Sequence, residues 1–105
     1  MSERVLVLSA VGSLEEAERI ARGLVEQRLA ACVNIVPGVV SVYRWKGALE
    51  RGAEWLLVIK TRAEAFEAVR GALCAMHSYE VPEVLAVPIE AGHLPYLAWL
   101  DDGVA

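Results

Sequence analysis

An imidazole, a phenol and two carboxylates crowd one short segment of this sequence, whose residues are His77, Ser78, Tyr79, Glu80, Val81, Pro82 and Glu83. Segments that join a helix to a strand carry function more often than the regular elements do. Nitrogen and oxygen donors together suit a divalent transition metal, and we predict that this segment lines a cleft between subunits. The structural alternative is that His77 stabilises a helix C-terminus, that Tyr79 packs its ring, and that both glutamates are solvated.

Two cysteines and a second histidine are the other candidate ligands, at Cys32, Cys74 and His93. None of them lies at the C-x2-C or H-E-x-x-H spacing by which local sequence builds a metal site, so any site must be assembled through the fold. Cys32 lies where a helix passes into a strand. We expect it either to pack as a small buried apolar residue or to face the predicted cleft. Cys74 lies beside the apolar stripe of a helix and has no evident partner.

Catalytic motifs are absent from the sequence. It contains no G-x-S-x-G elbow and no phosphate-binding glycine loop. Tyr43, Arg44 and Trp45 resemble a base-stacking platform, but Trp, Tyr and Arg also dominate interface hot spots, which suits a chain of net charge −4 better. We therefore expect no enzyme activity and no organic cofactor, with Tyr43 and Trp45 at a subunit interface. The last-ranked alternative is an enzyme that uses His77, Tyr79 and Glu80 at a subunit boundary.

Composition and charge exclude several classes of partner. The net charge of −4, the pI near 5.1 and the lack of a basic cluster argue against nucleic acid. No run approaches the ~20 apolar residues of a membrane span, and Met1–Arg4 lead into a strand without the apolar region of a signal peptide. We expect a cytoplasmic protein with reduced thiols and no membrane partner.

The elements that must position these residues follow from the hydrophobic periodicity. The order is strand, helix, strand, strand, helix, strand and a short terminal helix, within one domain at 1–105. This predicts an α+β fold of the ferredoxin-like βαββαβ type, an antiparallel sheet with two helices on one face. The predicted segments are a strand at 5–11, a helix with its apolar stripe at 17–25, a strand at about 32–45, a strand at about 49–60, a helix with Phe66, Val69, Leu73 and Met76 inward, a strand at 84–89 and a helix at 94–100.

Four local signals refine these elements. Ser13 with Glu16, and Thr61 with Glu64, have the spacing of a helix capping box. Pro37-Gly38 interrupts the long second strand, and because proline cannot donate to a ladder, this strand is predicted to be a kinked edge. Gly52 indicates a bulge in the third strand.

The strands also predict assembly. The first, third and fourth are apolar on both faces, and two helices can cover only one face of the sheet. The hydrophobic content of 56% and the mean hydropathy of +0.42 are high for a small monomer. An exposed apolar face of this size marks an association surface.

Matching residues along almost the whole chain resemble the CutA divalent-cation tolerance family. The resemblance implies a ferredoxin-like protomer, similar to the PII signalling proteins, and a tight homotrimer in which the long second and third strands pair across subunits. It also implies a role in tolerance of copper and other divalent metal ions. The residues that carry it are Leu29 to Ile35, Pro37-Gly38, Ser41, Tyr43, Trp45, Gly47, Glu54, Lys60-Thr61, His77, Tyr79, Pro82-Glu83, Tyr96-Leu97 and Trp99-Leu100.

The same resemblance implies a metal site. Family members that bind copper have a cysteine late in the first strand and two histidines before a Pro-Tyr pair. Those positions here are Ser9, Met76 and His77, with Ser78 in place of the proline. A methionine thioether can bind Cu(I), although a methionine in a helix stripe is more often part of a core. The alternative function is a PII-like signalling or scaffold module that binds a small metabolite or a partner protein in its intersubunit clefts.

Overall fold

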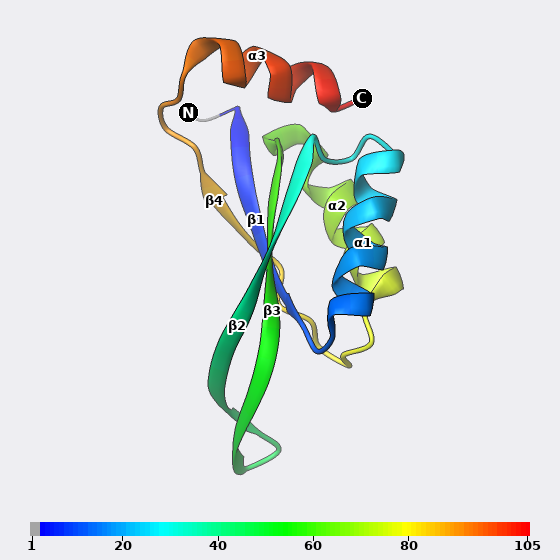
Figure 1. Cartoon of the computed structure of the whole chain (residues 1–105), viewed down its shortest axis with the longest axis vertical. Helices are drawn as coiled ribbons and strands as arrows, with labels where there is room; N and C mark the ends of the chain where they lie inside the picture. The colour runs from blue at the N-terminus through cyan, green and yellow to red at the C-terminus, as the bar shows by residue number, and fades with distance from the viewer. Residues whose placement is uncertain (1–2) are drawn as a thin grey trace.

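The chain folds into a four-stranded antiparallel sheet with two helices on one face (Figure 1). The apolar side chains that alternate along the strands are buried between the sheet and these helices. The computed structural model describes residues 3–105, so Met1 and Ser2, at the predicted start, lie outside it. The sheet order β2-β3-β1-β4 confirms the predicted ferredoxin-like α+β fold. The elements are β1 (Arg4–Val11), α1 (Leu14–Glu26), β2 (Cys32–Trp45), β3 (Ala48–Arg62), η1 (Ala63–Ala65), α2 (Phe66–Met76), β4 (Leu85–Pro88) and α3 (Leu94–Gly103).

The core lies between the sheet and the helices α1 and α2. Alternate residues of β1 and β3 point toward the helices and are fully buried, such as Val7 and its partner Ile59. Ile20 of α1 and Leu73 of α2 meet them from the other side and are also fully buried. The predicted stripe of α1 ends earlier than expected, because Val25 is 41% exposed.

Of the two predicted capping boxes, one is half formed and the other is wrong. Ser13 Oγ accepts a hydrogen bond from the Glu16 amide at 3.1 Å, but the Glu16 carboxylate binds the loop after α2 instead of returning to Ser13. Thr61 belongs to β3, where its hydroxyl donates to the Leu29 carbonyl at 2.6 Å. The following helical turn begins after Arg62 without a side-chain cap.

The strands β2 and β3 extend well beyond β1 as a two-stranded arm, defined here as residues 39–45 and 48–54 (Figure 1). The register shifts between Val36 and Val39, which confirms the predicted kink, and Gly38 has a φ of 78°. Gly52 pairs regularly with Ser41, so the bulge predicted there is wrong. Lys46 and Gly47 both have positive φ, as a type I′ hairpin turn requires.

The sheet face away from α1 and α2 is apolar, and it is largely open in the single chain. It carries Leu6 and Leu8 of β1 opposite Val87 and Leu85 of β4, and the last two are 43% and 55% exposed. The strand β2 is one edge of the sheet, as predicted. The predicted uncovered face is therefore present in the chain.

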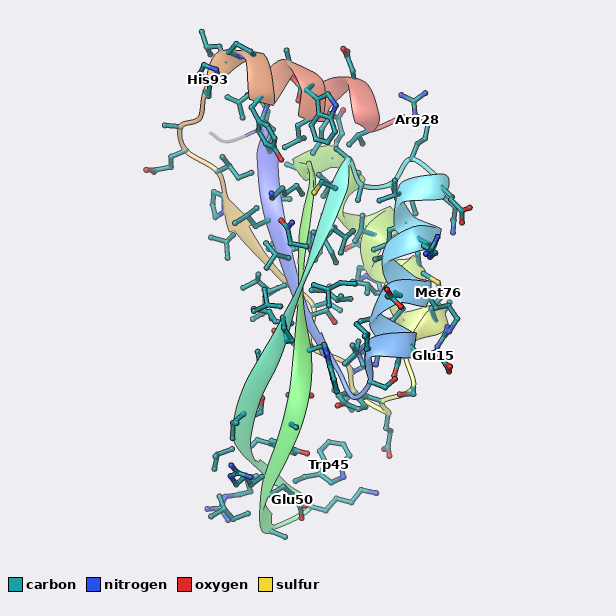
Figure 2. All side chains as sticks on the ribbon, viewed as in Figure 1. Glu15, Arg28, Trp45, Glu50, Met76 and His93 are labelled. Carbon is teal, nitrogen blue, oxygen red and sulfur yellow. The ribbon has the colours of Figure 1, made fainter. Side chains whose placement is uncertain are left out.

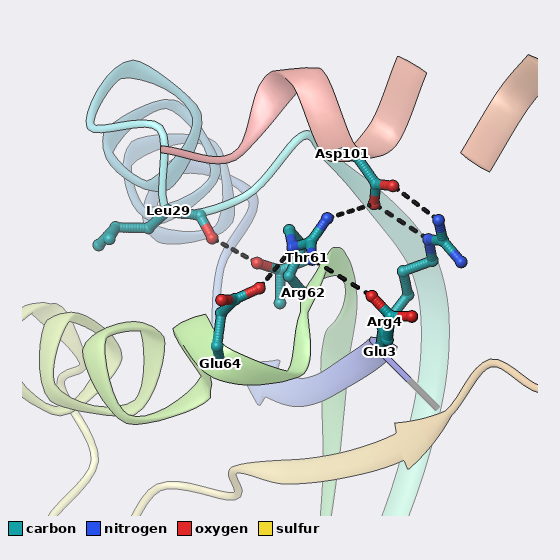
Figure 3. A network of polar contacts seen from close by, with 7 residues as sticks. All are labelled: Glu3, Arg4, Leu29, Thr61, Arg62, Glu64 and Asp101. Carbon is teal, nitrogen blue, oxygen red and sulfur yellow. Dashed lines mark hydrogen bonds and ion pairs between the residues drawn. The ribbon is translucent and has the colours of Figure 1, made fainter. Parts of the chain in front are cut away.

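The helix α3 lies across one end of the sheet (Figure 1), and its Asp101 belongs to the network of polar contacts drawn in Figure 3. Asp101 accepts a bidentate pair of hydrogen bonds from Arg4, at 3.0 and 2.6 Å, and lies 3.0 Å from the Arg62 guanidinium. These two cations offset the unfavourable position of a carboxylate at a helix C-terminus.

The longest described helix, α1, has 13 residues, and none of the helices within residues 3–105 is long and apolar enough to span a bilayer.

Candidate functional site

A cavity of about 830 Å³ lies between the arm and the loop that follows α2. It is lined from the arm by Tyr43 and Trp45 of β2 and by Glu54 of β3. The loop contributes residues 78–83, including Tyr79 and the two predicted carboxylates, Glu80 and Glu83. We call this cavity the arm cleft; it brings together most of the residues that the sequence marks as candidates.

Strand geometry explains why the arm side chains converge. Side chains alternate along a strand, so Val39, Tyr43 and Trp45 lie on one face of the arm. Glu54 lies directly opposite Val39 in the register and therefore shares this face. Figure 2 shows Trp45 near the distal end of the arm, projecting toward the side on which the helices lie.

Tyr79 links the loop to the arm. Its hydroxyl donates to Glu54 Oε2 at 2.7 Å, and it comes so close to Gly12 that a Cβ there would lie 3.3 Å from the hydroxyl oxygen. Burial of the ring, followed by the hydrogen bond to Glu54, raises the pKa of Tyr79 above its usual value. The phenol therefore stays protonated and acts as a donor.

His77 holds the loop in place from inside the protein. Its Nε2–H donates to the Ala10 carbonyl at 2.9 Å, and its Nδ1 accepts from the Tyr79 amide at 3.1 Å. These partners define the neutral tautomer with the proton on Nε2. The Glu16 carboxylate lies 3.6 Å from Nδ1 and also accepts from the Ser78 amide and hydroxyl, at 2.8 and 2.9 Å. The ring thus ties β1 to the loop, as a structural histidine would.

The residues predicted to bind metal do not form a donor set within one chain. Both ring nitrogens of His77 already have partners. Met76 lies in the helical layer (Figure 2), with its sulfur close enough to Gly23 of α1 that a Cβ there would be 3.2 Å away. Ser9 Oγ is buried and has no hydrogen-bond partner among residues 3–105. Within the same residues, no group of three or more His, Cys, Asp or Glu side chains could hold a metal ion. The metal assignment stays a prediction.

Cys32 lies away from the arm cleft. It pairs with Lys60 at the start of β2, whereas Tyr43 and Trp45 are near the end of that strand. Both cysteines are free thiols, with Cys32 partly buried and Cys74 exposed. Cys32 is therefore not part of the arm cleft, because it lies on the far side of the bulge between Val36 and Val39. Its position in a cleft between subunits stays a prediction.

Two carboxylates have roles that sequence reasoning missed. Glu16 has the spacing of a helix cap, yet its side chain holds the loop 62 residues further along the chain. Glu54 lies in the third strand next to Trp55, and its hydrogen bond to Tyr79 spans 25 residues. Glu54 could have been recognised because a carboxylate is unusual within a predicted strand of apolar residues. No local feature of the sequence distinguishes Glu16 from an ordinary helix-capping residue.

Known proteins resemble this chain over almost its whole length. The family model described as "CutA1 divalent ion tolerance protein" matches residues 5–103. The divalent-cation tolerance protein CutA of Thermus thermophilus is 50% identical over 95 residues, which is 90% of this chain and 92% of that protein. The chloroplastic protein CutA 1 of rice is 47% identical over 96 residues, covering 91% of this chain and 54% of the rice protein. The solved structure of a periplasmic CutA from Archaeoglobus fulgidus superposes with a TM-score of 0.94 at 45% identity, covering 97% of this chain and 99% of that one.

Proposed function

Because the chain belongs to the CutA1 divalent ion tolerance protein family, we propose that it acts in tolerance of divalent cations as a homotrimer that binds copper or another divalent ion. The observation that carries the proposal is the family match over residues 5–103, which includes every element from α1 to α3 and all of β1 except Arg4. Binding is the role we infer, since the matching family model is described by divalent ion tolerance.

The open sheet face supports the homotrimer. Leu85 is 55% exposed and Val87 is 43% exposed on strand β4, next to the half-buried Leu6 and Leu8. Burying apolar surface contributes about 25 cal/mol per Å² before the costs of association. The outer edge of β2, 14 residues long, offers main-chain groups for pairing with a second chain.

Light scattering at micromolar concentration tests the assembly. We expect a mass three times that of the 11.4 kDa chain. A monomeric mass would contradict the homotrimer.

Cytoplasmic location is part of the same proposal and rests on the two unpaired thiols, Cys32 and Cys74, although one relative carries a chloroplastic name and another a periplasmic one.

Copper binding at His77 should be weak. To coordinate a metal, the ring must give up a hydrogen bond to Ala10 or to the Tyr79 amide. Leaving a buried polar group unsatisfied costs about 1–3 kcal/mol, which weakens binding roughly 5- to 150-fold. The variant Ser9→Cys with Met76→His adds two donors and should bind copper more tightly than the wild type.

Titration with Cu(II) in a weakly coordinating buffer tests this site. His77→Ala and His77→Gln should both weaken binding by about tenfold or more. The glutamine can still donate to the Ala10 carbonyl, so it separates loss of a ligand from loss of the loop. His93→Ala is the matched control, because His93 precedes α3 and lies away from the loop. Equal affinity of His77→Gln and wild type would contradict a copper site at this residue.

The arm cleft favours a second candidate function, a PII-like signalling or scaffold module. A cavity of about 830 Å³ that combines aromatic rings with a few polar groups is the usual form of a small-molecule site. In this alternative the metal sensitivity of the family is indirect, and the bound molecule or partner protein carries the signal.

A further inference from the structure

The arm leaves the sheet without a third strand beside it. The strand β1 pairs with β3 from Trp55 to Arg62, so residues 48–54 of the arm pair with β2 alone. A two-stranded hairpin has little stability of its own. Since the arm extends well beyond β1 (Figure 1), its direction depends on the side chains that attach it to the rest of the protein.

Within residues 3–105, one hydrogen bond and one ion pair of side chains attach the arm or its turn. Lys46 Nζ lies 3.7 Å from Glu80 Oε1, but both side chains are 70% exposed, so this ion pair contributes little. The Tyr79 hydroxyl donates to Glu54 Oε2 at 2.7 Å, and a hydrogen bond to a carboxylate is stronger than one between neutral groups. The contact of Tyr79 with Glu54 is therefore the stronger attachment.

Glu54 lies at the base of the arm, where the direction of the arm is set. It precedes Trp55, the last partner of β1, and it pairs with Val39, the first residue of β2 that pairs after the bulge. The bulge, which includes Gly38 at a φ of 78°, bends β2 at this level. A contact at Glu54 therefore holds the arm at the point about which it would turn.

Tyr79 is itself held firmly by the rest of the protein. Its amide donates to His77 Nδ1 at 3.1 Å, and its ring lies 4.7 Å from the His77 ring. On the other side, a Cβ on Gly12 would lie 3.3 Å from the Tyr79 hydroxyl oxygen. The hydroxyl thus has a fixed position from which it can orient the arm.

We propose that Tyr79 is a positioning residue for assembly, and that its hydrogen bond to Glu54 holds the arm in the direction in which it meets the neighbouring subunits. The inference rests on the proposed homotrimer and names a residue that prepares each subunit for it. Association of subunits with a mobile arm includes the cost of ordering that arm. An arm that is already fixed avoids this cost, so the subunits combine faster.

Refolding of the full chain from urea at several protein concentrations tests the proposal, with tryptophan fluorescence to follow folding and light scattering to follow assembly. We expect Tyr79→Phe to slow the concentration-dependent assembly step about fivefold, the effect of losing one hydrogen bond. The concentration-independent folding step should stay as in the wild type. A hydroxyl that only stabilised the single chain would change the folding step or the unfolding rate instead.

The matched control is Tyr96→Phe, which removes the phenol hydroxyl that accepts a hydrogen bond from Lys60 Nζ at 3.3 Å, in α3 and away from the arm. This variant should assemble at the wild-type rate. Glu54→Gln keeps an acceptor oxygen for the Tyr79 hydroxyl and should also assemble at close to the wild-type rate.

A double-mutant cycle separates this contact from contacts of either residue with a neighbouring subunit. Glu54→Leu removes the acceptor and should slow assembly as Tyr79→Phe does, and the double variant should be no slower than either single variant. An unchanged assembly rate for Tyr79→Phe, or additive slowing in the double variant, would overturn the positioning role while the homotrimer stands. A wild-type chain that stays monomeric at every concentration would overturn both.

Discussion

Thr61 is a buried hydroxyl near the end of β3 that holds the connection between α1 and β2. It is fully buried, and it donates to the Leu29 carbonyl at 2.6 Å. Thr61→Val keeps the shape of the side chain but leaves that carbonyl without its donor, so we expect a loss of about 1–2 kcal/mol in the free energy of unfolding. Urea denaturation at a fixed protein concentration measures it.

The control for this change is Thr61→Ser, which keeps the donor and removes only a methyl group. If the serine variant loses more stability than the valine variant, packing of the methyl group, and not the hydrogen bond, is what matters at this position.

Asp101 makes the stability of the protein depend on acid pH. Its hydrogen bonds with Arg4 lower the pKa of the carboxyl below its usual value, and Arg62 adds to the effect. A depressed pKa in the folded state gives stability that is fully present above the unfolded value of about 3.9 and is lost as the pH falls through the folded value. Asp101→Asn should therefore lower the melting temperature at pH 7, and the difference from wild type should shrink below about pH 4.

The matched control is Asp102→Asn, a change of the same kind one residue further along α3. Asp102 accepts a hydrogen bond from Arg28 through its main-chain oxygen, which the substitution keeps. A melting difference for Asp101→Asn that stayed constant down to the acid range would contradict the role of the carboxylate charge.

Two glycines in helices should respond in opposite ways to the same substitution. A Cβ on Gly71 of α2 meets no atom within 4 Å, so Gly71→Ala should raise the free energy of unfolding by about 0.5–1 kcal/mol. A Cβ on Gly103 of α3 would lie 2.9 Å from the Ala31 Cβ and 3.1 Å from its Cα, which is backbone. Gly103→Ala should lower it by about 1–3 kcal/mol.

The same denaturation series measures both glycine variants. The outcome that would count against the tight approach of α3 to Ala31 is a Gly103→Ala protein at least as stable as Gly71→Ala.

The elements were largely predictable because their signals are local. Alternating apolar residues and the Pro37-Gly38 interruption identify β2 and its bulge without knowledge of the rest of the chain. The prediction of the second capping box is wrong because the Thr61 hydroxyl donates a hydrogen bond to the distant Leu29 carbonyl and is not available to cap the helix. The bulge predicted at Gly52 is absent, because a glycine can occupy a regular pair in an exposed arm at a small cost in stability.

Some of the residues that line the arm cleft could be predicted from the sequence, but the contacts between them could not. The density of polar groups in the loop points to Tyr79, Glu80 and Glu83, whereas the sequence predicts Tyr43 and Trp45 at a subunit interface and not in this cleft. The contacts that shape the cleft, such as Tyr79 with Glu54, join residues far apart in the chain, and no local pattern encodes them.

At the scale of the whole molecule, the open sheet face should decide assembly. Leu85→Glu places a charge at a position 55% exposed in the single chain, where it costs little for folding but would be buried in an assembly. We expect this variant to sediment as a folded species of lower mass than the wild type. Leu14→Glu is the control, because Leu14 is similarly exposed, at 47%, in the first turn of α1 on the helical side. A trimeric Leu85→Glu protein would contradict assembly through this face.

The position of β1 has a consequence for how the chain folds as it is synthesised. β1 emerges from the ribosome before the other strands of the sheet, yet it lies inside the sheet, between Trp55–Arg62 of β3 and Leu85–Pro88 of β4. The hairpin of β2 and β3 can form as soon as both strands are outside, since its contacts are close in sequence. The nascent chain must therefore keep the apolar β1 unpaired while the hairpin forms, which makes this strand the segment most in need of a chaperone during translation.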